Sequence, residues 1–353
     1  MRMRRTSGSN VGVIQVLVFL LILMTSTPVS GHVPGMAHGN TDPGNAVEVE
    51  DPVKSWAYYD EIHEFGEMRF YQMYLDAGDA LVVSIFVPDE NGIVPSLSLW
   101  GPGYEGNQTL DEWAGNPNES PVTVAGDPDG AGSFEPFTPS VLYERLELNM
   151  DVNGSGTYYL AIFGNGGTGR FGIAIGGREE FTPQEWILVP VNVLFIRLWE
   201  GQSLLVVLAP LILVVILGIH RMAFGTLKMI DRTLRGIRRR PVLQWVISLG
   251  GLMIVGTGAM GFLQLIFSFI DLGWVDAMII PLSLASGQVL LGRSIHLRSL
   301  DIVNEFPRKD RNTLALLGLL GLTAWAGLII GPALVVLGSL MSLPEKYRIP
   351  SGT

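Results

Sequence analysis

Hydrophobic and polar residues follow two different patterns along the 353-residue chain. Between residues 45 and 180, apolar and polar side chains alternate in short runs, such as 68–75, 80–87 and 157–163, separated by Gly, Pro, Asn and Asp. Many short alternating runs with turn residues between them are typical of an antiparallel sandwich. We therefore expect an all-β, jelly-roll-like antiparallel sandwich over residues 55–183.

The second pattern is a series of long apolar segments in the C-terminal part of the chain. They cover residues 203–219, 243–270, 274–292 and 313–341. A helix that crosses the hydrocarbon layer of a bilayer needs about 20 mainly apolar residues. The pattern predicts an all-α bundle of four transmembrane helices over residues 203–341, followed by an extracytoplasmic tail at 342–353.

Residues 184–202 are apolar but interrupted by charged and kinking residues, among them Pro190 and Arg197. If this segment spanned the membrane, the Arg-rich loop that follows would face outward. We interpret it as a linker in the membrane interface, with Trp186 and Trp199 as anchors at headgroup depth.

The N-terminus has the layout of an export signal. Residues 1–5 contain three arginines, residues 11–24 are apolar apart from Gln15, and small residues follow as far as Gly31. This order predicts a signal peptide at 1–31, cleaved to leave His32 at the new N-terminus. An uncleaved anchor helix is the alternative. Residues 32–54, rich in Gly and Pro, are predicted to be a flexible leader.

Charge divides the chain at the same place as hydropathy. Residues 32–202 hold 26 of the 33 acidic residues and 6 of the 23 basic ones, a net charge of −20, whereas the rest carries +10. Arginines gather in the loops after the first and third apolar segments, which places these loops in the cytoplasm by the positive-inside rule. We expect a multi-pass protein of the cell membrane with its acidic domain outside. This segregation argues against a nucleic-acid partner.

Three strings in the sandwich region carry a family resemblance. They are FYQMYLDAGD at 70–79, SLSLWGPG at 96–103 and GTYYLAI at 156–162. The region from 55 to 177 resembles the bacterial and archaeal pre-peptidase C-terminal domain, a β-sandwich appended to secreted enzymes. The resemblance implies a binding or spacing module, sometimes calcium-dependent. No peptidase precedes it here, which departs from that family, and the membrane part is not covered.

Two sets of residues are candidate metal ligands. A new N-terminus at His32, together with Met36 and His38, offers nitrogen and thioether ligands suited to copper; the alternative is a solvated leader. Asp127 and Asp129, in an Asp-Pro-Asp-Gly turn, offer oxygen ligands suited to calcium, although Asp-Gly is also ordinary turn chemistry.

Three glycosylation sequons lie in the predicted exported region. They begin at Asn107, Asn118 and Asn153, and their predicted export raises the prospect of a glycoprotein.

The motif search favours binding over catalysis. The sequence contains no GxSxG, HExxH, Walker or dinucleotide-binding glycine motif. We expect a non-enzymatic, membrane-anchored surface module that binds a ligand or partner. The alternatives are copper capture and delivery through the His/Met leader, and an accessory subunit of a membrane complex or transporter. Gly-rich helices, with GxxxG spacing at Gly327 and Gly331, would suit self-association or a membrane protein partner within the lipid bilayer.

Overall fold

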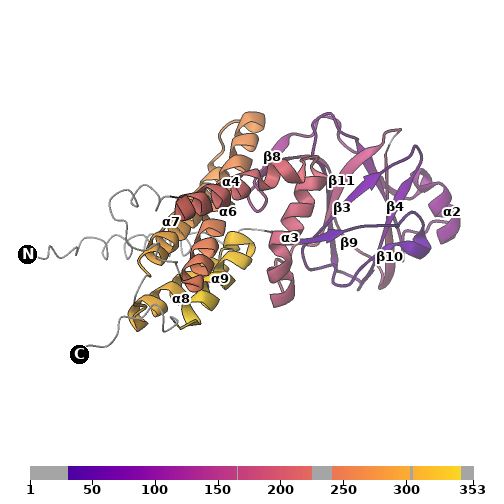
Figure 1. Ribbon diagram of the computed structural model, residues 1–353. Coiled ribbons are helices and arrows are strands. Elements are labelled where there is room, and N and C mark those ends of the chain that lie inside the picture. Colours follow the sequence, from indigo (N-terminus) through magenta and orange to yellow (C-terminus); the bar gives the residue numbers. More distant parts are fainter. Residues whose placement is uncertain (1–30, 165, 225–240, 303–304, 343–353) are drawn as a thin grey trace, which may run out of the picture. The chain divides into compact units, whose positions relative to one another are not determined.

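A computed structural model describes residues 31–164, 166–224, 241–302 and 305–342 (Figure 1). The chain divides into two compact units. One is the β-unit, Ser30–Gln202 with the short segment Asp271–Gly273, and the other is the helical unit, Ser203–Ile270 and Trp274–Thr353. The predicted order of a β-sandwich followed by helices is confirmed at this level.

The β-unit consists, over its described residues, of two sheets. In order across the six-stranded sheet, the strands are β1 (Val33–Met36), β3 (Trp56–Ile62), β11 (Gly169–Ile175), β5 (Ala80–Val87), β9 (Ser140–Asp151) and β8 (Gly132–Glu135). Across the five-stranded sheet they are β2 (Val47–Val49), β4 (Met68–Leu75), β10 (Gly156–Gly164), β6 (Pro95–Trp100) and β7 (Val122–Val124). The short elements are η1 (Pro43–Asn45), α2 (Leu110–Gly115) and η2 (Pro117–Glu119).

The core of the β-unit lies between the two sheets and follows the two-residue period of the strands. Leu81, Val83 and Ile85 of β5 face Leu160 and Ile162 of β10, and each is at most 1% exposed. Fully burying a side chain of this kind stabilises a fold by roughly 1.5–3 kcal/mol. Since the chain has no cysteine, this burial takes the place of disulfides.

The predicted flexible leader is instead part of both sheets. Its strands β1 and β2 pair in parallel with β3 and β4, respectively. Val33 and Val49 are each 2% exposed, and Val49 is part of the core cluster, while the backbone of both strands completes the sheet edges. The prediction of a purely antiparallel sandwich is therefore wrong at these two edges. A strand of three or four residues is too short to show a reliable alternation in sequence.

The predicted interfacial linker contains a 17-residue helix, α3 (Pro183–Trp199), that begins in a capping box between Thr182 and Glu185. The indole nitrogen of Trp199 donates a hydrogen bond to the carbonyl oxygen of Asp60 at 3.0 Å. Its ring packs edge-on against Tyr59, with centroids 4.9 Å apart. Trp199, predicted to be a lipid anchor, is thus held by the sandwich.

Within the part of the helical unit that the structure describes, three helices are long and apolar enough to cross a membrane. They are α4 (Leu204–Phe224), α6 (Val242–Leu272) and α7 (Ile279–Leu300), the last preceded by η3 (Asp276–Met278). The fourth predicted span is divided into α8 (Arg308–Leu322), η4 (Ala326–Leu328) and α9 (Ile330–Leu340). The predicted count of four spanning helices is therefore not confirmed.

Positive backbone angles cause this interruption. The φ angles of Trp325, Leu328 and Ile329 are 46°, 55° and 66°, whereas an α-helix requires about −63°. A run of apolar residues does not reveal such a reversal, because leucine and isoleucine are typical of uninterrupted apolar helices as well.

Glycines let the helices of this unit approach closely. A Cβ atom at Gly251 of α6 would lie 2.9 Å from the carbonyl oxygen of Gly292 in α7. At Gly331 of α9 it would lie 2.9 Å from the carbonyl oxygen of Gly250. Both contacts are backbone against backbone, the arrangement that small residues permit in membrane helices.

Candidate functional site

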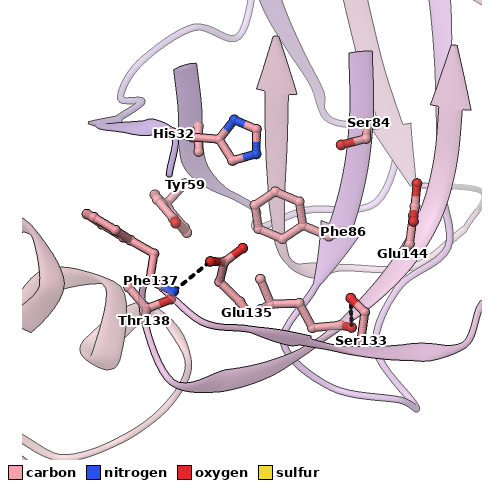
Figure 2. A pocket seen from close by; sticks show the side chains of 11 residues that line it. His32, Tyr59, Ser84, Phe86, Ser133, Glu135, Phe137, Thr138 and Glu144 are labelled. Carbon is pink, nitrogen blue, oxygen red and sulfur yellow. Dashed lines mark hydrogen bonds between the residues drawn. The ribbon is translucent and has the colours of Figure 1, made fainter. Parts of the chain in front are cut away.

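The β-unit contains a pocket of about 150 Å³ on the face of the six-stranded sheet that points away from the core (Figure 2). The residues that line it are His32, Ala57, Tyr59, Ser84, Phe86, Ser133, Glu135, Phe137, Thr138, Leu142 and Glu144. Apolar and aromatic side chains are thus combined with two carboxylates and one imidazole.

Strand alternation explains why these side chains share one face. Ser84 and Phe86 lie two residues apart on β5, and Leu142 and Glu144 lie two apart on β9, so each pair points to the same side of the sheet. Glu135 comes from β8, which pairs with β9 at the sheet edge. Neighbouring strands therefore place an aromatic floor beside acidic side chains.

Glu135 is the carboxylate that extends from β8 into this site (Figure 2). Burial raises its pKa, and the nearby negative charge of Glu179 acts in the same direction. The backbone N–H of Phe137, which donates to Glu135 Oε1 at 2.9 Å, partly opposes this rise. Glu144 also has a raised pKa, first because of burial and second because of Glu147. A positive charge in the pocket would stabilise the ionised form of both carboxylates.

His32 lies across the pocket from these groups (Figure 2). Its Nδ1 atom is hydrogen-bonded to Ser55 Oγ. Burial lowers the pKa of the imidazole, and the charge of Glu179 opposes this only in part. The neutral imidazole is therefore favoured near pH 7. Tyr59 stays protonated as well, because burial raises the pKa of its phenol.

Helix α3 contacts the aromatic floor of the pocket. The Trp199 ring lies 4.9 Å from that of Tyr59 and 6.1 Å from that of Phe86, measured between centroids. Arg197 of the same helix donates from Nη2 to the carbonyl oxygen of Pro139 at 3.1 Å. Only residues 200–203 separate α3 from α4 in the chain. Two rings that line the pocket, those of Tyr59 and Phe86, therefore also contact α3, the helix that precedes the first apolar span in the chain.

The structure separates the three candidate copper ligands. Val33–Met36 is a strand, so the backbone from first to last residue covers about 10 Å. Met36 packs with the apolar cluster of the outer sheet face, and His38 is exposed beyond the end of β1. His32 faces the pocket described above. A site that used His32, Met36 and His38 together would require β1 to leave the sheet.

The candidate calcium turn is already organised by an arginine. Asp127 Oδ1 accepts a hydrogen bond from the backbone N–H of Asp129 at 2.9 Å, an ordinary side-chain turn. The buried guanidinium of Arg145 donates to the carbonyl oxygens of Pro128, at 2.7 Å, and Glu90. A cationic side chain therefore occupies backbone oxygens that a calcium ion would use. Among the described residues, no group of three or more His, Cys, Asp or Glu side chains could hold a metal.

The three sequon asparagines Asn107, Asn118 and Asn153 are exposed in the β-unit. Asn153 Nδ2 donates to the Tyr104 hydroxyl at 2.9 Å, so a glycan there would change an existing contact. Glycosylation itself stays a prediction.

The pocket was missed in the sequence because its residues come from five separated segments. Its carboxylates, Glu135 and Glu144, resemble any of the other acidic residues of this region until the pairing of β8 with β9 is known. The one local signal is the sequence Glu-Pro-Phe-Thr-Pro at 135–139, and this sequence is not specific for a binding pocket.

Comparisons with known proteins give limited information. No family model matches the chain, and no curated protein matches it. The crystal structure of Aeromonas hydrophila PliG, a periplasmic lysozyme inhibitor of g-type lysozyme, is 14% identical with a TM-score of 0.25, covering 40% of this chain and 97% of its own. The pre-peptidase C-terminal domain of collagenase from Bacillus anthracis is 12% identical with a TM-score of 0.23, covering 38% and 97%.

Each match covers 40% or less of this chain, and neither assigns it to a family.

Proposed function

We propose that the protein is a membrane-anchored surface module whose sandwich binds a small ligand, or one protruding group of a partner, in the pocket beside α3. The observation that supports this proposal is the pocket, which is lined by the carboxylates of Glu135 and Glu144 and by the rings of Tyr59 and Phe86. Carboxylates combined with aromatic faces favour a positively charged group that also has apolar surface. An organic ammonium group fits this description.

The orientation of the module follows from the charge distribution. The acidic β-unit lies outside the cell and the arginine-rich loops lie inside, as the positive-inside rule and the export-type N-terminus both require. Support for a role in binding also comes from the sequence resemblance to the pre-peptidase C-terminal domain.

The pocket lies beside α3, the helix that precedes α4 in the chain. A ligand above Phe86 and Tyr59 would touch rings that Trp199 already contacts. This arrangement suits a binding module that serves a membrane complex, so the accessory-subunit hypothesis is compatible with the pocket.

Choline and its uncharged carbon isostere, dimethylbutanol, test this function on the full chain in nanodiscs. We expect calorimetry to detect binding of choline and at least tenfold weaker binding of the isostere, because the pocket selects for positive charge. Glu135→Gln should weaken choline binding about tenfold, equivalent to ~1.4 kcal/mol. Glu48→Gln, an exposed change on β2 of the other sheet, is the matched control. Equal binding of choline by both variants, or none by the wild-type chain, would refute the assignment.

A further inference from the structure

The last apolar stretch of the chain forms a helical hairpin. Helix α8 packs along α9, with Gly318 close to Val336 and Gly321 close to Pro332. Arg311, in the first turn of α8, donates from Nε to the carbonyl oxygen of Ser339 at 2.9 Å and from Nη2 to that of Leu340 at 2.8 Å. The beginning of α8 and the end of α9 therefore lie at the same end of the hairpin.

Neither helix of the hairpin is long enough to cross a bilayer. With a rise of ~1.5 Å per residue, the 15 residues of α8 and the 11 of α9 extend over about 22 Å and 16 Å. The hydrocarbon layer is ~30 Å thick. In addition, α8 begins with the charged residues 308–311, which shortens its apolar part.

The tip of the hairpin lies against the middle of two longer helices. Gln288, near the centre of α7, donates from Nε2 to the carbonyl oxygen of Ala324 at 2.8 Å. Thr257, halfway along α6, accepts at Oγ1 from the backbone N–H of Gly327 at 2.8 Å. Ala324 and Ala326 are 3% and 0% exposed. Two polar side chains thus satisfy backbone groups that the helix break has freed.

These contacts match the requirements of a broken helix at membrane depth. Hydrocarbon offers no water to an unpaired N–H or C=O, so irregular backbone occurs there only where protein buries and bonds it. Gln288 and Thr257 are polar side chains in the middle of apolar helices, and each bonds to a backbone group of the break. The strained residues Leu328 and Ile329, with φ angles of 55° and 66°, make the reversal that a spanning helix would not contain.

We propose that the α8–α9 hairpin is a re-entrant element, which enters the bilayer beside α6 and α7 and returns to the side from which it came. The spans among the described residues are then α4, α6 and α7, so Ser342 emerges on the side of Glu305 and opposite the sandwich. Ser342 would then lie on the side opposite to the one expected for the tail at 342–353 from four spans; the rest of that tail lies outside the described residues. This inference does not depend on the binding role of the pocket.

Cysteine labelling tests the inference directly, because the chain has no cysteine of its own. Three full-length variants, Ser342→Cys, Glu305→Cys and Asp111→Cys, each place one thiol at an exposed position. They are treated with a membrane-impermeant maleimide in sealed vesicles of one orientation, before and after permeabilisation. We expect Ser342→Cys and Glu305→Cys to react under the same condition, and Asp111→Cys under the other.

The comparison is internal, so it requires no knowledge of which side is outside. Ser342→Cys reacting together with Asp111→Cys would overturn the re-entrant assignment and restore four spans. Met341→Cys, one residue earlier and 41% exposed, replaces Ser342→Cys if that variant is not monodisperse on gel filtration. Loss of choline binding would leave this labelling pattern unchanged, so the two proposals fail separately.

Discussion

The sandwich and the helical unit satisfy their backbone polar groups in different ways. In the sandwich, strands such as β10 bond to neighbours on both sides, β4 and β6, across long continuous registers. In the helical unit most bonds lie within single helices, but the break around residues 323–329 also forms bonds with other helices, through Gln288 and Thr257. Sheet bonding is therefore distributed along whole strands, whereas the break combines a few local backbone bonds with bonds from two side chains of other helices.

The two units also differ in where their apolar side chains lie. Large apolar residues of the sandwich are mostly in its core, whereas Leu205, Val242 and Ile270 of the helical unit are 77%, 67% and 70% exposed. A bilayer would cover such residues, and in lipid an apolar side chain gains little by moving between lipid and protein. Hydrophobic burial therefore stabilises the sandwich, while close packing and hydrogen bonds stabilise the helices.

The largest effect expected from this contrast is in the sandwich core. Leu160→Ala removes a fully buried side chain of β10 and should lower the free energy of unfolding of the sandwich by about 2–5 kcal/mol. Leu213→Ala, at a 57% exposed position of α4, is the matched control and should change little. Thermal unfolding of the full chain in nanodiscs, followed by circular dichroism, measures both. Similar losses in the two variants would show that burial stabilises both units alike.

How much could be predicted from sequence differs between the same two regions. Alternation along β4, β5 and β10 is long enough to indicate strands, and the first three apolar segments correctly indicated helices. Strands β1 and β2 were missed because their pairing is decided by distant residues of β3 and β4. The break in the fourth segment was missed because it depends on backbone angles and on side chains from other helices, which apolar composition does not encode.

A smaller effect is expected where one side chain supports the hairpin tip. Gln288→Leu removes the donor to the Ala324 carbonyl and leaves it unpaired in a buried place, which should cost about 1–3 kcal/mol. Ser286→Ala is the control, since its hydroxyl bonds only to the carbonyl of Leu282 within the same helix. Hydrogen exchange of residues 323–329 should rise in Gln288→Leu alone. Unchanged exchange in both would mean that the tip does not rely on Gln288.

The smallest expected effect is the pH dependence that the titratable groups of the pocket cause. For Glu135, it acts in opposite directions on the stability of the sandwich and on choline binding. Burial raises the pKa of Glu135 above the usual 4.5, so the protonated form is more favoured in the folded chain than in the unfolded chain. Its contribution to stability is complete below pH 4.5 and is lost as the pH rises through the raised pKa. Choline binding requires the opposite form, the carboxylate, and should weaken as the pH falls through the raised pKa.

His32 affects the pH dependence of stability in the opposite direction to Glu135, but it affects the pH dependence of choline binding in the same direction. Because burial lowers its pKa below 6.5, its contribution to stability is present above pH 6.5 and is lost as the pH falls through the lowered value. Protonated His32 would also repel a cation, so both groups weaken choline binding in acid. Calorimetry at pH 7 and pH 5 should therefore show a smaller pH effect in Glu135→Gln than in the wild-type chain. An equal effect in the two would assign the pH dependence to the remaining titratable groups of the pocket, Glu144 and His32, and would remove Glu135 from the binding site.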